Sequence, residues 1–252
     1  MAFERGSLVL IDYTAKIKDS DEIFETTMNE DAKNLQSYDS TIKYEPRLVS
    51  IGEGWVIRGL DEVLANANQG DNIDVEIPPD KAFGERDQAK IRMIPLRKLG
   101  EKGEELKPGD IVDVDQRRGI VRFIGSGRVQ IDFNHRLAGK TLSYNVKVLK
   151  KLETSEEKIS SLIRRRLPIE TDKIKTVIED DRLDIEIPSE SLSIEGIQIV
   201  KRAITNEIFR FLPKVETIKF IEIFAKPKAE ATDKKAEATD KKAEATDKKA
   251  EA

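Results

Sequence analysis

Within residues 1–152, a single short stretch, LDEVLANAN at residues 60–68, has the apolar spacing of a helix. The segments on both sides of it, SLVLIDYTAKI and NIDVEIPPDKAFG, alternate apolar and polar residues. Because a period of two is typical of strands with one buried face, these runs predict a sheet that covers the helix. Asp61 suits the first turn of that helix, and Gly70 suits its C-terminal stop. The pattern therefore predicts a sheet wrapped on one short helix.

Residues 85–137 change character. They combine the turn signals PGD and GSG with short alternating runs, which is typical of a small all-β unit. The alternation of apolar and polar residues seen before the insertion resumes in KTLSYNVKVLKKL, residues 140–152. We therefore predict that residues 85–137 are an insertion and that the segment after them closes the first sheet.

Residues 155–225 form a self-contained pattern. Helical spacing in EEKISSLIRRRLP, ending at Pro168, and in SIEGIQIVKRAITNEIFRFLP is combined with alternation in KIKTVIEDDRLDIEIP and VETIKFIEIF. The element order is α-β-β-α-β. A small sheet with two helices on one face would bury these apolar stripes, so we predict a separate α+β domain.

The end of the chain repeats the unit AEATDKK three times and finishes in AEA. Its only apolar residues are alanines, which bury too little surface to offset the entropy of the chain. We expect disorder or marginal helix here, and a solubilising or spacing role for the tail.

Composition excludes several kinds of chemistry. The sequence has no cysteine and one histidine, His135, so it offers no disulfide, thiolate site or multi-histidine metal site. The net charge of −4 gives no overall basic field for nucleic acid. No apolar run approaches the roughly 18 residues of a membrane span, and the N-terminus has no secretory signal pattern. These features predict a cytoplasmic location, no membrane partner, no metal and no cofactor.

Five motifs, taken in order, resemble the FKBP family of peptidyl-prolyl cis-trans isomerases: IDYTAKI, EIFETT, GEGWVIRGLDEVLANANQGD, IPPDKAFGERD and TLSYNVKVL. The stretch NHRLAGKTLSYNV is similar to the return from the inserted chaperone domain of SlyD-like members, and the long archaeal members add a C-terminal domain. The resemblance covers about residues 5–152.

The resemblance implies an α+β fold with an FKBP-like antiparallel sheet wrapped on a short helix, an inserted small all-β domain and a C-terminal α+β domain. The expected units are an isomerase domain (1–84 and 138–152), a chaperone-like β domain inserted in the flap (85–137), the C-terminal domain (153–225) and the repeat tail (226–252).

Carried over position by position, the resemblance implies a pocket for a proline ring. Leu60 would lie beneath the ring, the backbone N–H of Ile57 would bind the substrate, and Gly59 would allow a tight entry to the helix. Leu60 replaces the indole of the best-known members, Phe83 replaces their flap tyrosine, and Glu25 replaces an aspartate. The full set of predicted site residues is Tyr13, Phe24, Glu25, Val56, Ile57, Leu60, Phe83 and Tyr144.

The implied activity is acceleration of X–Pro isomerisation in unfolded or nascent chains. A peptide bond has a rotation barrier of about 18–20 kcal/mol, and a site that binds the twisted amide better than the planar forms lowers it without a general base, nucleophile or metal. The insert would add affinity for unfolded or proline-containing polypeptides. Met93, Ile94 and Leu96 are its candidate binding residues, with a place in the insert's own core as the alternative.

Two other functions stay open at this point. Leu60 and Phe83 are compatible with a non-catalytic holdase or adaptor. The run of Arg164, Arg165 and Arg166 fits a solvated helix end favoured by the helix dipole, and its alternative is an acidic partner, RNA or a ribosome contact.

Three further features have two interpretations each. The apolar stripe in IEGIQIVKRAITNEIFRFL faces either its own sheet or a second copy in a homodimer. We interpret His135 as a structural hydrogen-bonding residue rather than a catalytic or metal-binding one. Trp55 fits a packing or rim role beside the pocket rather than a place beneath it.

Overall fold

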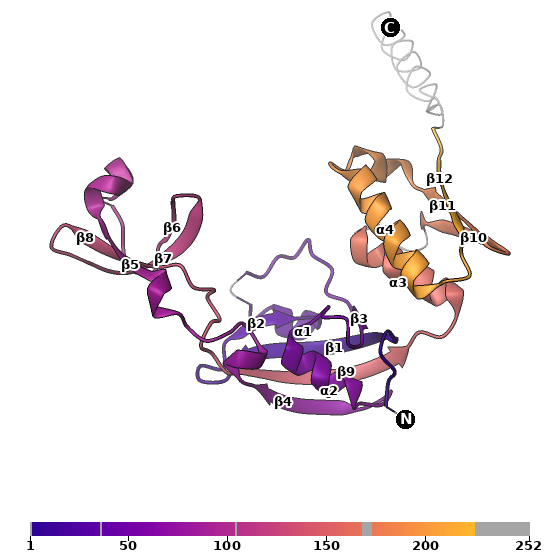
Figure 1. The fold of residues 1–252 in the computed structure, drawn as a ribbon, viewed down its shortest axis with the longest axis horizontal. Helices are drawn as coiled ribbons and strands as arrows, with labels where there is room; N and C mark the ends of the chain where they lie inside the picture. The colour runs from indigo at the N-terminus through magenta and orange to yellow at the C-terminus, as the bar shows by residue number, and fades with distance from the viewer. Residues whose placement is uncertain (1, 36, 104, 168–172, 225–252) are drawn as a thin grey trace, which may run out of the picture.

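The computed structural model describes residues 2–35, 37–103, 105–167 and 173–224, and Figure 1 shows their arrangement. Within these ranges the chain forms three sheets. The α+β prediction is confirmed, because one sheet wraps on a short helix, a small β unit interrupts it, and a helix-and-sheet unit follows it. Both Pro168 and the tail at 226–252 lie outside the described residues. None of the helices in the described ranges combines the length and apolarity needed to cross a membrane.

The first sheet has five strands, and every pairing in it is antiparallel. The order is β2-β1-β9-β4, and β3 pairs with the start of β1. The prediction that residues 140–152 close this sheet is confirmed, because β9 pairs with β1 on one side and with β4 on the other. The strands are β1 (Leu8–Ile17), β2 (Ile23–Thr26), β3 (Arg47–Ser50), β4 (Asn72–Ile77) and β9 (Leu142–Lys151), and a one-turn helix, α1 (Asn29–Ala32), follows β2.

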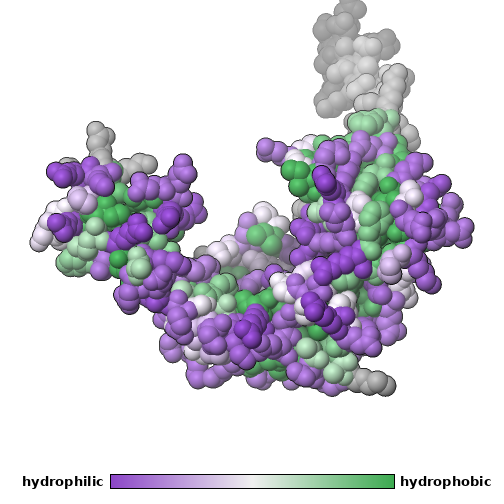
Figure 2. All heavy atoms as spheres, in the orientation of Figure 1, coloured by the Kyte–Doolittle hydropathy of each residue, from purple (hydrophilic) through white to green (hydrophobic). Residues whose placement is uncertain are grey.

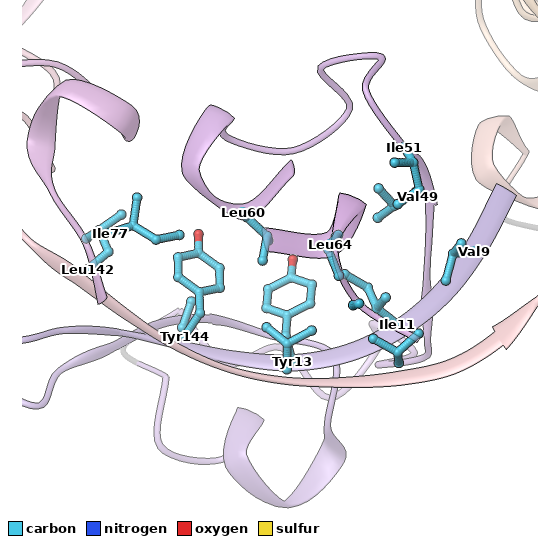
Figure 3. Close-up of a cluster of buried hydrophobic side chains, with 14 of the residues drawn as sticks. Val9, Ile11, Tyr13, Val49, Ile51, Leu60, Leu64, Ile77, Leu142 and Tyr144 are labelled. Carbon is cyan, nitrogen blue, oxygen red and sulfur yellow. The ribbon is translucent and has the colours of Figure 1, made fainter. Parts of the chain in front are cut away.

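Helix α2 (Arg58–Ala65) packs on one face of this sheet through Leu60 and Leu64, both fully buried. Figure 3 shows these two side chains above the strands. The Asp61 carboxylate, in the first turn as predicted, accepts the N–H groups of the loop after β3, at 2.8 and 3.2 Å. The predicted end at residue 68 is wrong. The chain leaves the helix at Asn66, and Gly70, at φ +92°, lies in the following turn, where its N–H donates to β9.

The inserted unit is a four-stranded antiparallel sheet in the order β5-β8-β7-β6. Its core is small, with Val121, Val129 and Ile131 fully buried. The elements are β5 (Ile91–Pro95), a 3₁₀ segment (Leu96–Gly103), β6 (Ile111–Val114), β7 (Arg117–Gly125) and β8 (Arg128–Asp132), preceded by 3₁₀ turns at Pro79–Lys81 and Gln88–Lys90.

The C-terminal unit has the predicted order α-β-β-α-β. Its strands pair in the order β10-β11-β12, antiparallel and then parallel, and alternate residues of β11 are buried beneath the helices. The elements are α3 (Ser155–Arg166), β10 (Lys175–Glu179), β11 (Arg182–Ile187), a 3₁₀ turn (Ser189–Ser193), α4 (Ile197–Phe211) and β12 (Thr217–Glu222).

The C-terminal unit shares a core with the first sheet. Leu8, Leu48 and Leu152 belong to the same buried cluster as Ile159 and Leu162 of α3. Burial of apolar surface of this kind holds two units in a fixed relation. The insert and the C-terminal unit rise at opposite ends of the first sheet in Figure 1, and Figure 2 shows the surface hollowed between them. Helix α3 is thereby placed beside β3.

Candidate active site

A cavity of about 320 Å³ opens between α2 and the first sheet. Seven of the eight predicted site residues line it, and the eighth, Phe24, packs behind it. Two residues that the sequence did not assign to the site, Arg47 and Trp55, complete the wall. The lining residues are Tyr13, Glu25, Arg47, Trp55, Val56, Ile57, Leu60, Phe83 and Tyr144.

The two tyrosines come from neighbouring strands. Tyr144 on β9 lies opposite Ala15 on β1, two residues along from Tyr13, so both rings project from the same face of the sheet. Their centroids are 5.9 Å apart, and both hydroxyls point to the side of Leu60 in Figure 3. Phe24 meets Tyr144 edge to face at 6.1 Å, which supports that ring from behind.

Burial raises the pKa of both Tyr13 and Tyr144, and the nearby Glu25 carboxylate raises each further. Both phenols are therefore neutral at physiological pH and retain a proton to donate. The cavity accordingly combines aromatic walls with two fixed hydroxyl groups.

The floor and one rim come from the start of α2. Leu60 is 2% exposed, and its side chain closes the base of the cavity. Ile57 precedes the helix in an extended conformation, and its carbonyl accepts the first helical hydrogen bond, from the Asp61 N–H at 3.0 Å. Within the described parts of the chain, the Ile57 N–H donates to no acceptor. Ile57 also lines the cavity, and the binding of a substrate carbonyl by this N–H stays a prediction.

Arg47 organises the polar side of the cavity. Its Nη1 donates to the Tyr13 hydroxyl oxygen and to the Glu25 carboxylate, each at 2.7 Å. Glu25 is thus held in an ion pair. One sequence signal was available for this residue, because the alternation of RLVS places Arg47 on the same face as Val49, which is part of the core beneath α2.

Trp55 stands at the rim that faces the C-terminal unit. The Arg165 guanidinium lies 3.7 Å from the centre of its ring, and Phe211 meets it edge to face at 5.5 Å. This is the packing and rim role expected from the sequence, with partners from a different domain. A cation over an indole face at this distance is attracted by the ring quadrupole.

Phe83 forms the wall on the side of the insert, and His135 supports it. The two rings are stacked, with centroids 4.3 Å apart and planes 8° from parallel. The Nδ1 atom of His135 accepts the Leu137 N–H at 3.2 Å. Burial, with a smaller contribution from Arg136, lowers the pKa of His135, so the ring is neutral at physiological pH. His135 thus has the structural hydrogen bond expected of it, and its ring also braces the cavity wall.

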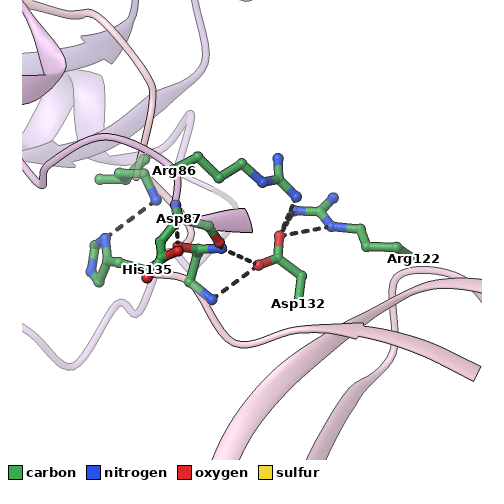
Figure 4. Close-up of polar contacts among 7 residues, drawn as sticks. Arg86, Asp87, Arg122, Asp132 and His135 are labelled. Atoms are coloured by element: carbon green, nitrogen blue, oxygen red, sulfur yellow. Dashed lines mark hydrogen bonds and ion pairs between the residues drawn. The ribbon is translucent and has the colours of Figure 1, made fainter. Parts of the chain in front are cut away.

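The two chain segments that join the insert to the first sheet are held together by hydrogen bonds and ion pairs close to His135 (Figure 4). Asp132, 2% exposed, accepts hydrogen bonds from Asn134 and the guanidinium groups of Arg86 and Arg122. Asn134 in turn bonds both the N–H and the carbonyl of Asp87. Burial alone would raise the pKa of Asp132, but these donors more than offset it and hold that pKa below its usual value. Asp132 therefore stays charged and holds the two connecting segments together.

The three candidate binding residues of the insert differ in how buried they are. Ile94 and Leu96 pack against the insert's core, which is the alternative the sequence left open for them. Met93 is 48% exposed, and with Phe123, 57% exposed, it flanks Gln130 in register across β5, β8 and β7. Met93 and Phe123 therefore form an exposed apolar pair on neighbouring positions of the sheet, and Ile111 on β6, 65% exposed, is a further exposed apolar residue of the insert.

Comparison with protein families gives matches along most of the chain. Residues 2–99 match the model described as FKBP-type peptidyl-prolyl cis-trans isomerase. Residues 92–137 match the model of the FKBP26 IF domain, and residues 155–225 match that of the FKBP26 C-terminal domain.

Individual relatives agree with these matches. The chain is 30% identical over 145 residues to a short-type peptidyl-prolyl cis-trans isomerase of Methanocaldococcus jannaschii, an alignment that covers 58% of this chain and 91% of the relative. It is 32% identical over 126 residues to the FKBP-type isomerase SlyD of Helicobacter pylori, covering 48% and 67%. A 16 kDa FKBP-type isomerase of Escherichia coli is 28% identical over 151 residues, covering 58% and 91%.

Proposed function

Because this chain belongs to the FKBP-type peptidyl-prolyl cis-trans isomerases, we propose that the cavity between α2 and the first sheet is where it rotates X–Pro bonds. The observation that carries this assignment is that residues from five separate motifs of the sequence line one cavity. The aromatic walls and Leu60 receive the proline ring, and the Ile57 N–H binds a neighbouring carbonyl.

The proposed mechanism is conformational. The planar amide is stabilised by resonance and is more polar than the twisted amide, so apolar walls that replace water around the bound amide weaken the planar form relative to the transition state. Binding the proline ring and one carbonyl holds one side of the rotating bond while the other side turns. Each 1.4 kcal/mol or so of preference for the twisted form speeds exchange about tenfold. Glu25 acts in this scheme through its ion pair with Arg47, which keeps the Tyr13 hydroxyl in place.

The test is cis-to-trans turnover of a short X–Pro peptide by the full chain and by Phe83→Ala. Phe83 is half-buried, so this change removes a wall with less damage to the core than a change at Tyr13, which is 3% exposed. The matched control is Val177→Ala, an exposed apolar residue on β10. We expect Phe83→Ala to lose most of the acceleration and the control to keep it. Equal turnover by all three proteins would place the isomerase site elsewhere.

We further propose that the insert binds unfolded or proline-containing polypeptides through Met93 and Phe123, giving the protein chaperone activity. Both side chains are about half exposed and lie on one face of the insert's sheet. Methionine and phenylalanine suit this role because they offer adaptable apolar contact to many sequences. The cavity between α2 and the first sheet is called the prolyl cavity below. The hydrogen bonds of Asp132 hold the insert in a fixed relation to this cavity, so a chain bound to the insert has a raised effective concentration there.

The insert is tested with Met93→Ser/Phe123→Ser in the full chain. The expected result is weaker suppression of aggregation of an unfolded protein and slower proline-limited refolding of a protein substrate. Turnover of a short peptide, measured in the same preparation, reports whether the cavity is intact. Undiminished suppression of aggregation by the double variant would contradict this role for the insert.

A further inference from the structure

A second cavity, of about 420 Å³, lies between the first sheet and helix α3 of the C-terminal unit. Four arginines line it: Arg47 from β3 and Arg164, Arg165 and Arg166 from the last turn of α3. These four are called the arginine cluster below. Glu45 is the one acidic residue among those that line this cavity.

The second cavity adjoins the prolyl cavity through two direct links. Arg47 lines both cavities. Arg165 lines the second cavity and places its guanidinium on the ring of Trp55, which lines the first. The two cavities are therefore close enough for residues near a bound proline to reach the arginine cluster, since an extended chain advances about 3.3–3.6 Å per residue.

The charges of the cluster are incompletely paired. Arg165 and Arg166 share a single carboxylate, that of Glu207, with the Arg165 contact at 2.7 Å. The other two arginines each have one carboxylate partner, Glu25 for Arg47 at 2.7 Å and Glu45 for Arg164 at 3.5 Å, and Glu45 also pairs with Lys43 at 3.9 Å. The four arginines share three carboxylates, so there is one more arginine than carboxylate, and the surplus lies within a cavity large enough for a side chain.

The dipole of α3 accounts for arginines in its last turn, but it does not account for their direction. The Arg165 side chain is only 28% exposed and lies against Trp55 rather than in solvent. Burial lowers the pKa of Arg165, and repulsion from Arg166 and Arg47 adds to this, while Glu207 opposes it. An added anion would relieve that repulsion and gain bidentate hydrogen bonds from a planar guanidinium.

We propose that the second cavity is a subsite for an acidic side chain, Asp or Glu, of the polypeptide substrate, located within a few residues of the proline. This inference rests on the proposed prolyl cavity. It means that the C-terminal unit contributes to substrate choice, because it supplies three of the four arginines. The enzyme should therefore favour prolines that have an acidic neighbour.

The test uses short X–Pro peptides in which one glutamate is placed in turn at each of the four positions before and after the proline. Each peptide is compared with the same peptide carrying glutamine there, and kcat/KM for cis-to-trans turnover is measured with the full chain at low salt. At one or more positions the glutamate peptide should be preferred by about fivefold, which is the size of a favourable solvent-accessible ion pair of about 1 kcal/mol. The preference should decline as salt is added.

The variant is Arg164→Gln/Arg166→Gln, since neither residue lines the prolyl cavity. Its control is Lys175→Gln/Arg182→Gln, which removes the same charge from β10 and β11. We expect the preference for glutamate to fall toward one in the variant and to persist in the control, while turnover of the glutamine peptides is unchanged in both.

Each contrary result has a distinct meaning. Acceleration of the glutamine peptides with no preference for glutamate at any position, or a preference that survives in the variant, would refute the subsite alone. No acceleration of any peptide would refute the prolyl cavity itself. If an RNA oligonucleotide inhibits the wild type but not the variant, and no preference for glutamate is seen, the cavity binds nucleic acid and the subsite proposal is overturned.

Discussion

Gly59→Ala should damage the enzyme through packing, although alanine is the better helix former. Gly59 is buried in the first turn of α2, between Ile57 and Leu60 of the prolyl cavity. A Cβ atom at this position would lie 2.4 Å from Cγ2 of Ile77 and 3.3 Å from Cβ of Lys81. The helix and β4 would have to separate by about 1 Å to restore the ordinary contact of 3.4 Å.

Two opposing free energies decide the magnitude. Alanine in place of glycine favours a helix by up to about 1 kcal/mol, whereas overpacking of a core costs about 1–3 kcal/mol. The expected net loss of unfolding free energy is therefore about 1 kcal/mol. Because the displaced helix carries Ile57 and Leu60, peptide turnover should fall by about tenfold or more, since a shift near 1 Å in a site can cost up to about a hundredfold.

The assay pairs urea unfolding with turnover of a short X–Pro peptide, for Gly59→Ala, Ile77→Ala and the double variant. Ile77→Ala removes the Cγ2 atom that the new methyl group meets, so the double variant should be more stable than the sum of the two single effects predicts. The reasoning is refuted if Gly59→Ala is as stable and as active as the wild type, or if the two changes are simply additive.

Two further predictions concern side chains around the cavity. Arg47→Met keeps the aliphatic stem but leaves the buried Tyr13 hydroxyl without its donor. The free energy of unfolding, measured with urea, should therefore fall by about 1 kcal/mol. An unchanged urea midpoint would contradict the role given to Arg47. His135→Phe should retain the stack on Phe83 and remove a pH dependence. The pKa of His135 is lowered in the folded state, so as pH falls below about 6.5 the unfolded chain takes up a proton that the folded chain resists, and the wild type loses stability. Unfolding free energies at pH 7.5 and pH 5 should therefore differ less in the variant than in the wild type, and equal losses in both would disprove this.

Local pattern was sufficient for most elements of the fold. Alternation located β1, β4 and β9, and helical spacing located α3 and α4, because a period of 2 or 3.6 depends only on which face of an element is buried. The end of α2 was misplaced. The run LANAN continues the helical spacing to residue 68, but the chain turns at Asn66 so that the Gly70 N–H reaches Val148 on β9. That hydrogen bond joins residues far apart in the chain.

The residues of the candidate site also fall into two groups, those that sequence motifs predicted and those that depend on contacts between strands. Ordered motifs located seven residues of the cavity lining, since each motif keeps its spacing within one or two elements. Arg47 was missed because its partners, Tyr13 and Glu25, lie on other strands. In the insert, strand register alone separated exposed Met93 from Ile94, which lies against the core.

The order of the elements, the family and most of the prolyl cavity can be read from the amino-acid sequence, because they depend on periodicity and on short motifs. The residues that lie beside that cavity depend instead on how the folded units pack together. Leu8, Leu48 and Leu152 give the first sheet a second apolar face, and burial of that face brings α3 against β3. Arginines that look like a solvated helix end in the sequence are thereby placed in a cavity next to Trp55. Apolar burial has no direction of its own, so which surfaces meet is settled only when the whole chain has folded.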